Sequence, residues 1–135
     1  MQAHLATLCE RTEVRSDGTL DLVGAAPEVI DVAQLPWTGA LRFALVLQFE
    51  VVDDPTDIRL DVVVVRARDG AVVGRVDPGE LAHHRTARHV EGAPPYLPFA
   101  LDLRVELSEA GQHGVVVRNK DGQRLAFVVF VVRAA

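Results

Sequence analysis

Apolar residues occupy every second position in two long stretches of the chain, residues 41–51 and 97–107. Polar or charged residues stand between them, such as Arg42 and Gln48 in the first stretch and Asp102 in the second. Successive side chains of a β-strand point to opposite faces. Alternation of this length therefore predicts two strands, each with one face on a core.

Turn-forming pairs divide the rest of the chain into short segments. Asp17-Gly18, Asp69-Gly70 and Asp121-Gly122 each separate two β-prone runs, which is the pattern of a β-hairpin. The further strands predicted around these turns are residues 3–9, 20–23, 29–32, 58–64, 71–76, 112–118 and 125–132. No helical periodicity connects two strands, so we expect mainly antiparallel pairing.

These elements predict an all-β fold. The spacing of the turns favours an antiparallel β-sandwich of two sheets, immunoglobulin-like or C2-like, with about eight strands. The chain has 135 residues, of which 49% are apolar, and it contains no repeat, linker or low-complexity stretch. A chain of this length suits one domain with its own core, so residues 1–135 are expected to form a single β-sandwich domain.

Three of the predicted strands carry large apolar residues on both faces. Four valines follow one another in residues 62–65, and residues 127–132 are apolar without interruption. A sandwich strand that faces water on one side is normally polar on that side. The residues expected to point away from the core are Val46, Val63, Val65, Val128, Phe130 and Val132.

An exposed apolar face of this size is large enough to indicate an interaction surface. One possibility is that a second copy covers it, which would make the protein a homodimer. The other is that the chain's own residues 78–96 fold across it. Because that segment is mostly polar, the sequence favours the dimer. The predicted function is a non-enzymatic interaction or structural protein that self-associates through an apolar sheet face.

The alternation fails between residues 80 and 95, where several potential metal ligands gather. The candidates are Glu80, His83, His84 and His89. Histidine nitrogens together with a carboxylate are common zinc ligands. Arg85 and Arg88 add repelling charge, however, and a solvated polar loop is the other interpretation of this segment.

The loop of residues 53–57 is a second candidate, because Asp53, Asp54 and Asp57 offer oxygen ligands that suit calcium. One loop supplies few ligands, and aspartate is also common in ordinary turns. The alternative function is therefore a small-ligand or metal-binding module that uses residues 83–89 or this acidic loop.

Residues with catalytic potential are few. Ser16 and Ser108 are the two serines, and both fall in predicted turns, where a hydroxyl can cap the backbone. Cys9 is the single cysteine, so no disulfide forms within the chain, and its apolar neighbours predict a buried thiol. No phosphate loop or dinucleotide fingerprint occurs. We therefore expect neither an enzymatic activity nor a cofactor.

The net charge is −5, so no nucleic-acid partner is expected. All basic residues except Lys120 are arginines, and they form no cluster along the sequence. No apolar run approaches the roughly 18 residues that a membrane span requires. With no signal-peptide pattern at the N-terminus, this predicts a cytoplasmic protein without membrane contact.

Residues 4–10, 16–20 and 22–24, together with the later Asp69-Gly70 and Asp121-Gly122 turns and Gly111-Gln112-His113, form a pattern of turns and core positions. This pattern resembles that of a family of small uncharacterised bacterial proteins, a domain of unknown function, and it covers most of the chain. The resemblance implies an all-β, sandwich-like fold and no functional residue. His113 stands where an aromatic residue such as tyrosine is commoner in that family.

Overall fold

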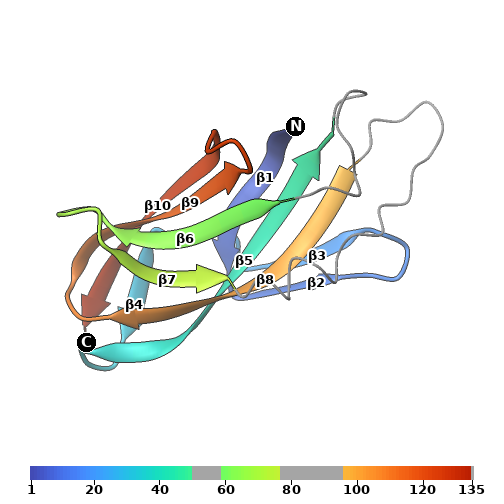
Figure 1. Ribbon diagram of the computed structural model, residues 1–135. Coiled ribbons are helices and arrows are strands. Elements are labelled where there is room, and N and C mark those ends of the chain that lie inside the picture. The colour runs from blue at the N-terminus through green and yellow to red at the C-terminus, as the bar shows by residue number, and fades with distance from the viewer. Residues whose placement is uncertain (50–58, 77–95, 135) are drawn as a thin grey trace.

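The computed structural model describes residues 1–49, 59–76 and 96–134, and every regular element in these ranges is a β-strand. Figure 1 shows these strands along the chain. They are β1 (Gln2–Cys9), β2 (Arg11–Val14), β3 (Leu20–Val23), β4 (Val29–Val32), β5 (Trp37–Gln48), β6 (Leu60–Arg66), β7 (Val72–Val76), β8 (Tyr96–Leu107), β9 (Gly111–Asn119) and β10 (Arg124–Ala134). The expected all-β fold is confirmed. None of the described residues belongs to a helix that could cross a membrane.

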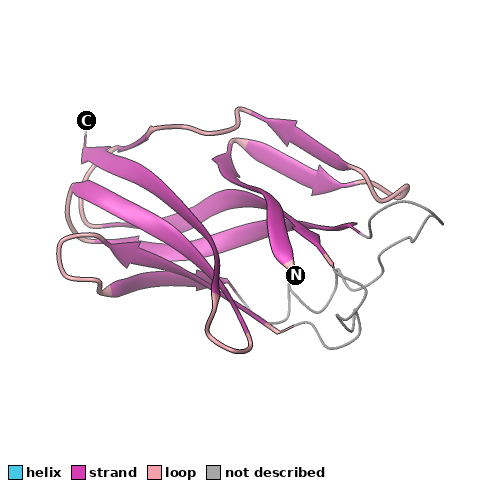
Figure 2. Cartoon of the chain, turned by 90° about the horizontal axis from the view of Figure 1, so that it is seen from above, coloured by secondary structure: helices cyan, strands magenta, loops and turns pink. Residues whose placement is uncertain are grey.

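Eight strands form one sheet in the order β1-β5-β8-β7-β6-β9-β10-β4, and β2 and β3 pair separately. Neighbours in the large sheet are antiparallel except for β4 and β10, which are parallel. Seen from above in Figure 2, the sheet curls round as a half-barrel. It therefore has an inner face, which holds the core, and an outer face.

The Asp-Gly turns form where the sequence predicts them. Gly18 and Gly70 have φ angles of +86° and +71°, which glycine adopts without the steric cost that a side chain would add. The carboxylate of Asp17 accepts hydrogen bonds from the backbone N–H and the hydroxyl of Thr19, at 3.0 and 2.6 Å. The carboxylate of Asp69 similarly accepts a bond of 3.1 Å from the N–H of Ala71.

The alternating residues of the two longest strands build the inner face. Phe43 and Leu45 of β5 and Phe99 and Leu101 of β8 are all 0% exposed and belong to one apolar cluster. β5 and β8 pair along the whole length of β5, so the two alternating faces lie side by side against the same core. The alternation in the sequence is thus correctly read as two half-buried strands.

The loop between β3 and β4 connects the two edges of the curled sheet. The backbone N–H of Ala26 donates a hydrogen bond to the carbonyl of Leu8 in β1 at 2.9 Å. The N–H of Val131 in β10 donates to the carbonyl of Glu28, also at 2.9 Å. Residues 26–32 therefore fasten β1 to β10, and β4 continues this segment alongside β10.

The architecture differs from the expected sandwich in two respects. The long strands join one continuous curled sheet, and the edge strand β4 runs parallel to its neighbour. The physical reason lies in β5 and β8, which have the longest apolar faces and pair with each other. Pairing them buries both faces in one core, whereas β5 is not paired with β6, the next described strand along the chain.

Candidate functional site

The outer face of the sheet carries a second set of apolar side chains, which follows from the pairing register. In one row across the sheet, Val129 lies opposite Gly114, Gly114 opposite Val65, and Val65 opposite Val72. Residues on the same face of each strand extend this row in both strand directions. The full set, named here the outer apolar face, is Val29, Val63, Val65, Val72, Val116, Phe127, Val129 and Val131.

Much of the outer apolar face is open to solvent. Its exposed members are Val29 (37%), Val72 (48%), Phe127 (47%), Val129 (44%) and Val131 (41%). Within the described ranges, only two other large apolar side chains, Val23 and Tyr96, are as exposed. Val63 and Val116, in the middle of the face, are 2% and 4% exposed. The exposed apolar surface is thus concentrated on one face, around β10.

The structure corrects three of the six residues predicted to point outward. Phe130 and Val132 are each 1% exposed and belong to the core, and Val128 packs against that core. Val63 and Val65 do lie on the outer face, as expected. Val46 is half-buried on β5 outside the core cluster, opposite Leu5 of β1 rather than beside the outer apolar face.

The correction arises because residues 125–132 are apolar at both alternating sets of positions. Pairing with β9 decides which set points inward. Phe130 lies opposite His113, and the two rings stack at 5.7 Å between centroids inside the sheet. Phe127 lies opposite Val116 on the other face. The residues of β10 that do point outward belong to the same apolar run, and each lies one position before a residue that the sequence predicted to point outward.

Phe127 is held against the outer face by its neighbours. A Cβ atom added at Gly114 would lie 2.6 Å from Cε2 of Phe127, so the ring covers this glycine. The guanidinium carbon of Arg124 lies 5.3 Å from the ring centroid, within the range of a cation–π contact. The missing side chain at Gly114 therefore makes room for an exposed aromatic ring that lies across the sheet.

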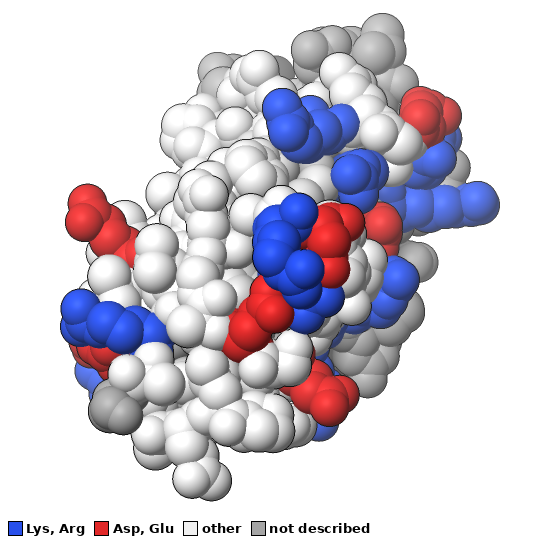
Figure 3. All heavy atoms as spheres, turned by 90° about the vertical axis from the view of Figure 1, so that its left-hand side faces the viewer, with Lys and Arg blue, Asp and Glu red and all other residues white. Residues whose placement is uncertain are grey.

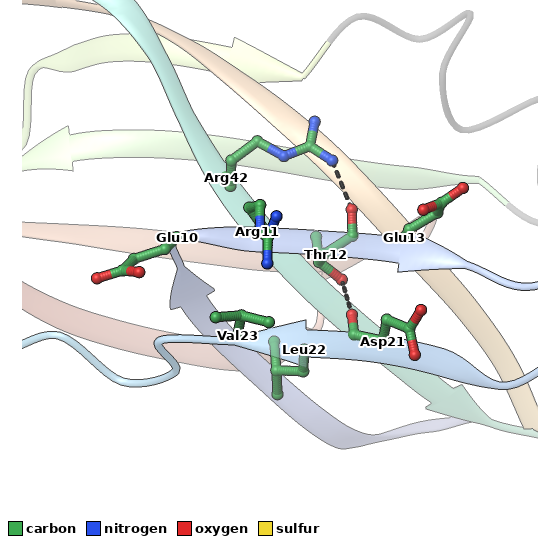
Figure 4. A pocket seen from close by; sticks show the side chains of 8 residues that line it. All are labelled: Glu10, Arg11, Thr12, Glu13, Asp21, Leu22, Val23 and Arg42. Carbon is green, nitrogen blue, oxygen red and sulfur yellow. Dashed lines mark hydrogen bonds between the residues drawn. The ribbon is translucent and has the colours of Figure 1, made fainter.

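The β2–β3 hairpin covers a different part of the outer face, over β5 and β8, and Arg42 fixes it there (Figure 4). Nη2 of Arg42 donates a hydrogen bond to the backbone carbonyl of Thr12 at 2.7 Å, and Nη1 pairs with the carboxylate of Asp102. The hydroxyl of Thr12 donates to the carbonyl of Asp21 at 2.9 Å. This partly buried polar contact gives Arg42, one of the polar positions in the alternation of β5, its partners on the outer face.

A hollow of about 610 Å³ lies beside this hairpin. Its lining is Glu10, Arg11, Thr12, Glu13, Asp21, Leu22, Val23 and Arg42. The guanidinium of Arg42 is already engaged by Thr12 and Asp102. The described residues of the lining are mainly charged or polar, so they offer polar and ionic contacts.

The candidate nucleophiles stand apart from one another. Cys9 is buried, as predicted, and burial raises the pKa of its thiol, an effect that nearby Arg42 only partly opposes. A thiol with a raised pKa is a weak nucleophile at neutral pH. Ser16 is exposed in a turn, and the hydroxyl of Ser108 accepts a hydrogen bond of 3.1 Å from Arg66.

Charged side chains connect the β6–β7 turn to the β8–β9 turn. Nη2 of Arg66 lies 2.7 Å from the Asp69 carboxylate, and Nε of Arg68 lies 2.8 Å from the Glu109 carboxylate. On the side of the molecule that faces left in Figure 1, Figure 3 shows basic and acidic side chains interleaved beside a broad uncharged area. This group of ion pairs holds the two turns together.

These ion pairs give the fold an acid-sensitive contact. The hydrogen bond from Arg66, followed by that from the backbone of Ala71, holds the pKa of the Asp69 carboxyl well below its usual range. A pKa lowered by folding stabilises the folded state above the unfolded pKa, about 4, and this contribution is lost as the pH falls below that value. We expect the melting temperature of the wild type to fall more steeply than that of Asp69→Asn between about pH 5 and pH 3. Parallel slopes in a pH series of thermal melts would contradict this expectation.

The predicted metal ligands lie outside the described residues. This holds for Glu80, His83, His84 and His89, and also for the acidic loop of residues 53–57. Among the residues that the structure does describe, no group of three or more His, Cys, Asp or Glu side chains is arranged to hold a metal ion. The alternative metal site therefore stays a prediction.

Comparison with known proteins identifies no relative: no family model, no curated protein and no solved structure matches this chain. The functional interpretation consequently depends on the surface chemistry of the molecule itself. Of the surfaces described above, the outer apolar face departs most from what a solvated sheet requires.

Proposed function

We propose that this protein is a non-enzymatic interaction module that forms a homodimer through its outer apolar face. The observation that carries the proposal is the concentration of exposed apolar side chains on one face, with Phe127, Val129 and Val131 in a row along β10. Soluble monomers rarely leave such a contiguous patch uncovered. A second copy presents the same patch, so a two-fold contact would cover both at once.

The expected strength of this dimer follows from the exposed fractions. Each of the five exposed side chains would contribute about 1 kcal/mol on burial, since complete burial contributes roughly 1.5–3 kcal/mol. Two copies together would gain about 10 kcal/mol, against an association cost of at least about 4 kcal/mol. The remaining free energy of at most about 6 kcal/mol corresponds to a dissociation constant of tens of micromolar or weaker. We therefore expect a reversible dimer rather than an obligate one.

Sedimentation equilibrium between about 5 and 500 µM tests the proposal, because this range brackets the expected dissociation constant. The wild-type mass should rise from that of a monomer towards that of a dimer. Val129→Lys should remain monomeric, because dimerisation would bury an unpaired charge in the contact. The matched control is Val23→Lys, which changes a valine of similar exposure, 42%, on the β2–β3 hairpin.

Two outcomes would contradict the proposal. One is a wild-type protein that stays monomeric over the whole concentration range. The other is a dimer that Val129→Lys and Val23→Lys weaken equally, because the contact would then lie elsewhere or depend only on net charge. Both variants change an exposed side chain, so each should fold with the circular dichroism spectrum of the wild type.

A further inference from the structure

Two pairs of arginines lie on the outer face, next to the outer apolar face and offset from each other by two residues along β6. Arg104 of β8 lies directly opposite Arg75 of β7, and Arg118 of β9 lies directly opposite Arg124 of β10. Asp61 of β6 stands between the two pairs, opposite Arg118 and with its carboxylate 3.7 Å from Arg75. We call these four arginines the arginine row; it crosses five adjacent strands of the sheet.

The arginine row places like charges where a sheet normally avoids them. Like charges directly opposite each other on neighbouring strands destabilise a sheet, and the row contains two such pairs in a chain whose net charge is −5. Within the described part of the chain, neither Arg104 nor Arg118 forms an ion pair or a side-chain hydrogen bond. Among the described residues, Asp61 forms the one ion pair with a member of the row, so most of the positive charge of the row has no ionic partner.

We propose that the arginine row binds an acidic segment of a partner protein. Guanidinium groups bind carboxylates through two parallel hydrogen bonds. Four spacings between neighbouring strands, each about 4.8 Å, give the row a length of roughly 19 Å, which about six residues of extended peptide would span. This site goes beyond the proposed dimer, since it uses different residues and rests on charge rather than on apolar surface.

An acidic peptide fits the row better than a nucleic acid does. Binding of single-stranded nucleic acid commonly relies on several aromatic platforms for the bases, and Phe127 is the one exposed aromatic of the described outer apolar face. The negative charge of the whole protein also disfavours a long polyanion.

Fluorescence anisotropy with a labelled octapeptide of alternating glutamate and valine tests the proposal. The wild-type protein should bind this peptide at low salt and should not bind the same peptide with lysine in place of glutamate. The double variant Arg104→Glu/Arg118→Glu should weaken binding by at least about tenfold, since it removes two paired carboxylate contacts. The control Arg11→Glu/Arg15→Glu makes the same change in net charge on the exposed β2–β3 hairpin. At about 100 mM salt, where the Debye length is about 10 Å, it should weaken binding clearly less than the double variant of the row does.

The binding variant should also be well folded. Arg104→Glu places a carboxylate opposite Arg75, and Arg118→Glu places one opposite Arg124, so two like-charge pairs become opposite-charge pairs. The Arg118→Glu carboxylate also lies opposite Asp61, which opposes this gain. The melting temperature of the double variant should therefore stay close to that of the wild type. A large fall in melting temperature would show that the arginines serve the fold, which would overturn the proposal.

Three further results would overturn it. The first is no binding of the glutamate peptide at about 10 mM salt, or binding that persists at about 1 M, where the Debye length has fallen from about 30 Å to about 3 Å. The second is an equal loss in the two double variants, which would trace binding to net charge alone. The third is tighter binding of an octamer of deoxythymidine, which would make the partner a nucleic acid. None of the four arginines belongs to the outer apolar face, so Val129→Lys should still bind the peptide. The two proposals can therefore fail independently of each other.

Discussion

Phe130→Ala should destabilise the protein by about 3–5 kcal/mol, the usual range for removing a fully buried aromatic ring. Phe130 is 1% exposed and stacks on His113 inside the curled sheet. Its removal would leave a cavity lined by residues of several strands, which the rigid sheet cannot close. Chemical denaturation at a fixed protein concentration would measure the change in unfolding free energy.

The matched comparison is Phe127→Ala, which removes the same ring three positions earlier in the same strand. Phe127 is 47% exposed on the outer face, so its loss should cost only about 1 kcal/mol. The difference between the two variants tests the assignment of faces in β10 directly. If Phe127→Ala were the more destabilising variant, the outward set predicted from the sequence would be right and the register of β10 wrong.

Gly74→Ala should be the second strongly destabilising substitution, by about 3 kcal/mol, at the upper end of the range for overpacking. A Cβ atom at this position in β7 would lie 2.5 Å from the backbone carbonyl oxygen of Arg104 and 2.5 Å from Cγ1 of Val105. A backbone oxygen held in a sheet cannot move aside. β7 would therefore have to separate from β8.

Gly114→Ala provides the control for the same chemical change. The atoms that its Cβ would meet are the far end of the Phe127 ring, which can turn towards solvent. Unfolding curves should therefore show a cost of about 1 kcal/mol or less for Gly114→Ala, well below that for Gly74→Ala. Equal costs at the two positions would mean that β7 and β8 are not as closely packed as the structure indicates.

The strands themselves were largely predictable from the sequence, because their signals are local. Alternation located β5 and β8, and Asp-Gly turns located the hairpins around Gly18, Gly70 and Gly122. The order of the strands was not predictable in this way. Neither the pairing of β5 with β8 nor the parallel pairing of β4 with β10 leaves a signal between neighbouring residues, so an antiparallel sandwich fitted the same pattern.

The candidate site was predicted only in part, for related reasons. An apolar outer face was expected because Val63 and Val65 flank inward-pointing valines, and both do point outward. In β10 the sequence pattern did not indicate whether Phe127 or Phe130 faces outward. The pairing of β10 with β9 determines that Phe127 does. The arginine row could not be recognised in the sequence, because the order of the sheet alone brings its members from β7, β8, β9 and β10 onto neighbouring strands of one face.

The bridge made by residues 26–32 has a consequence for how the chain folds. It joins β1, the first of the described strands to leave the ribosome, to β10, the last of them. The half-barrel cannot be fastened until nearly all of these strands have been synthesised, and such a high contact order slows folding to milliseconds or longer. During that interval the edges of β1 and β9 are open to pairing with other chains. Newly made molecules should therefore depend more on chaperones than the finished protein does.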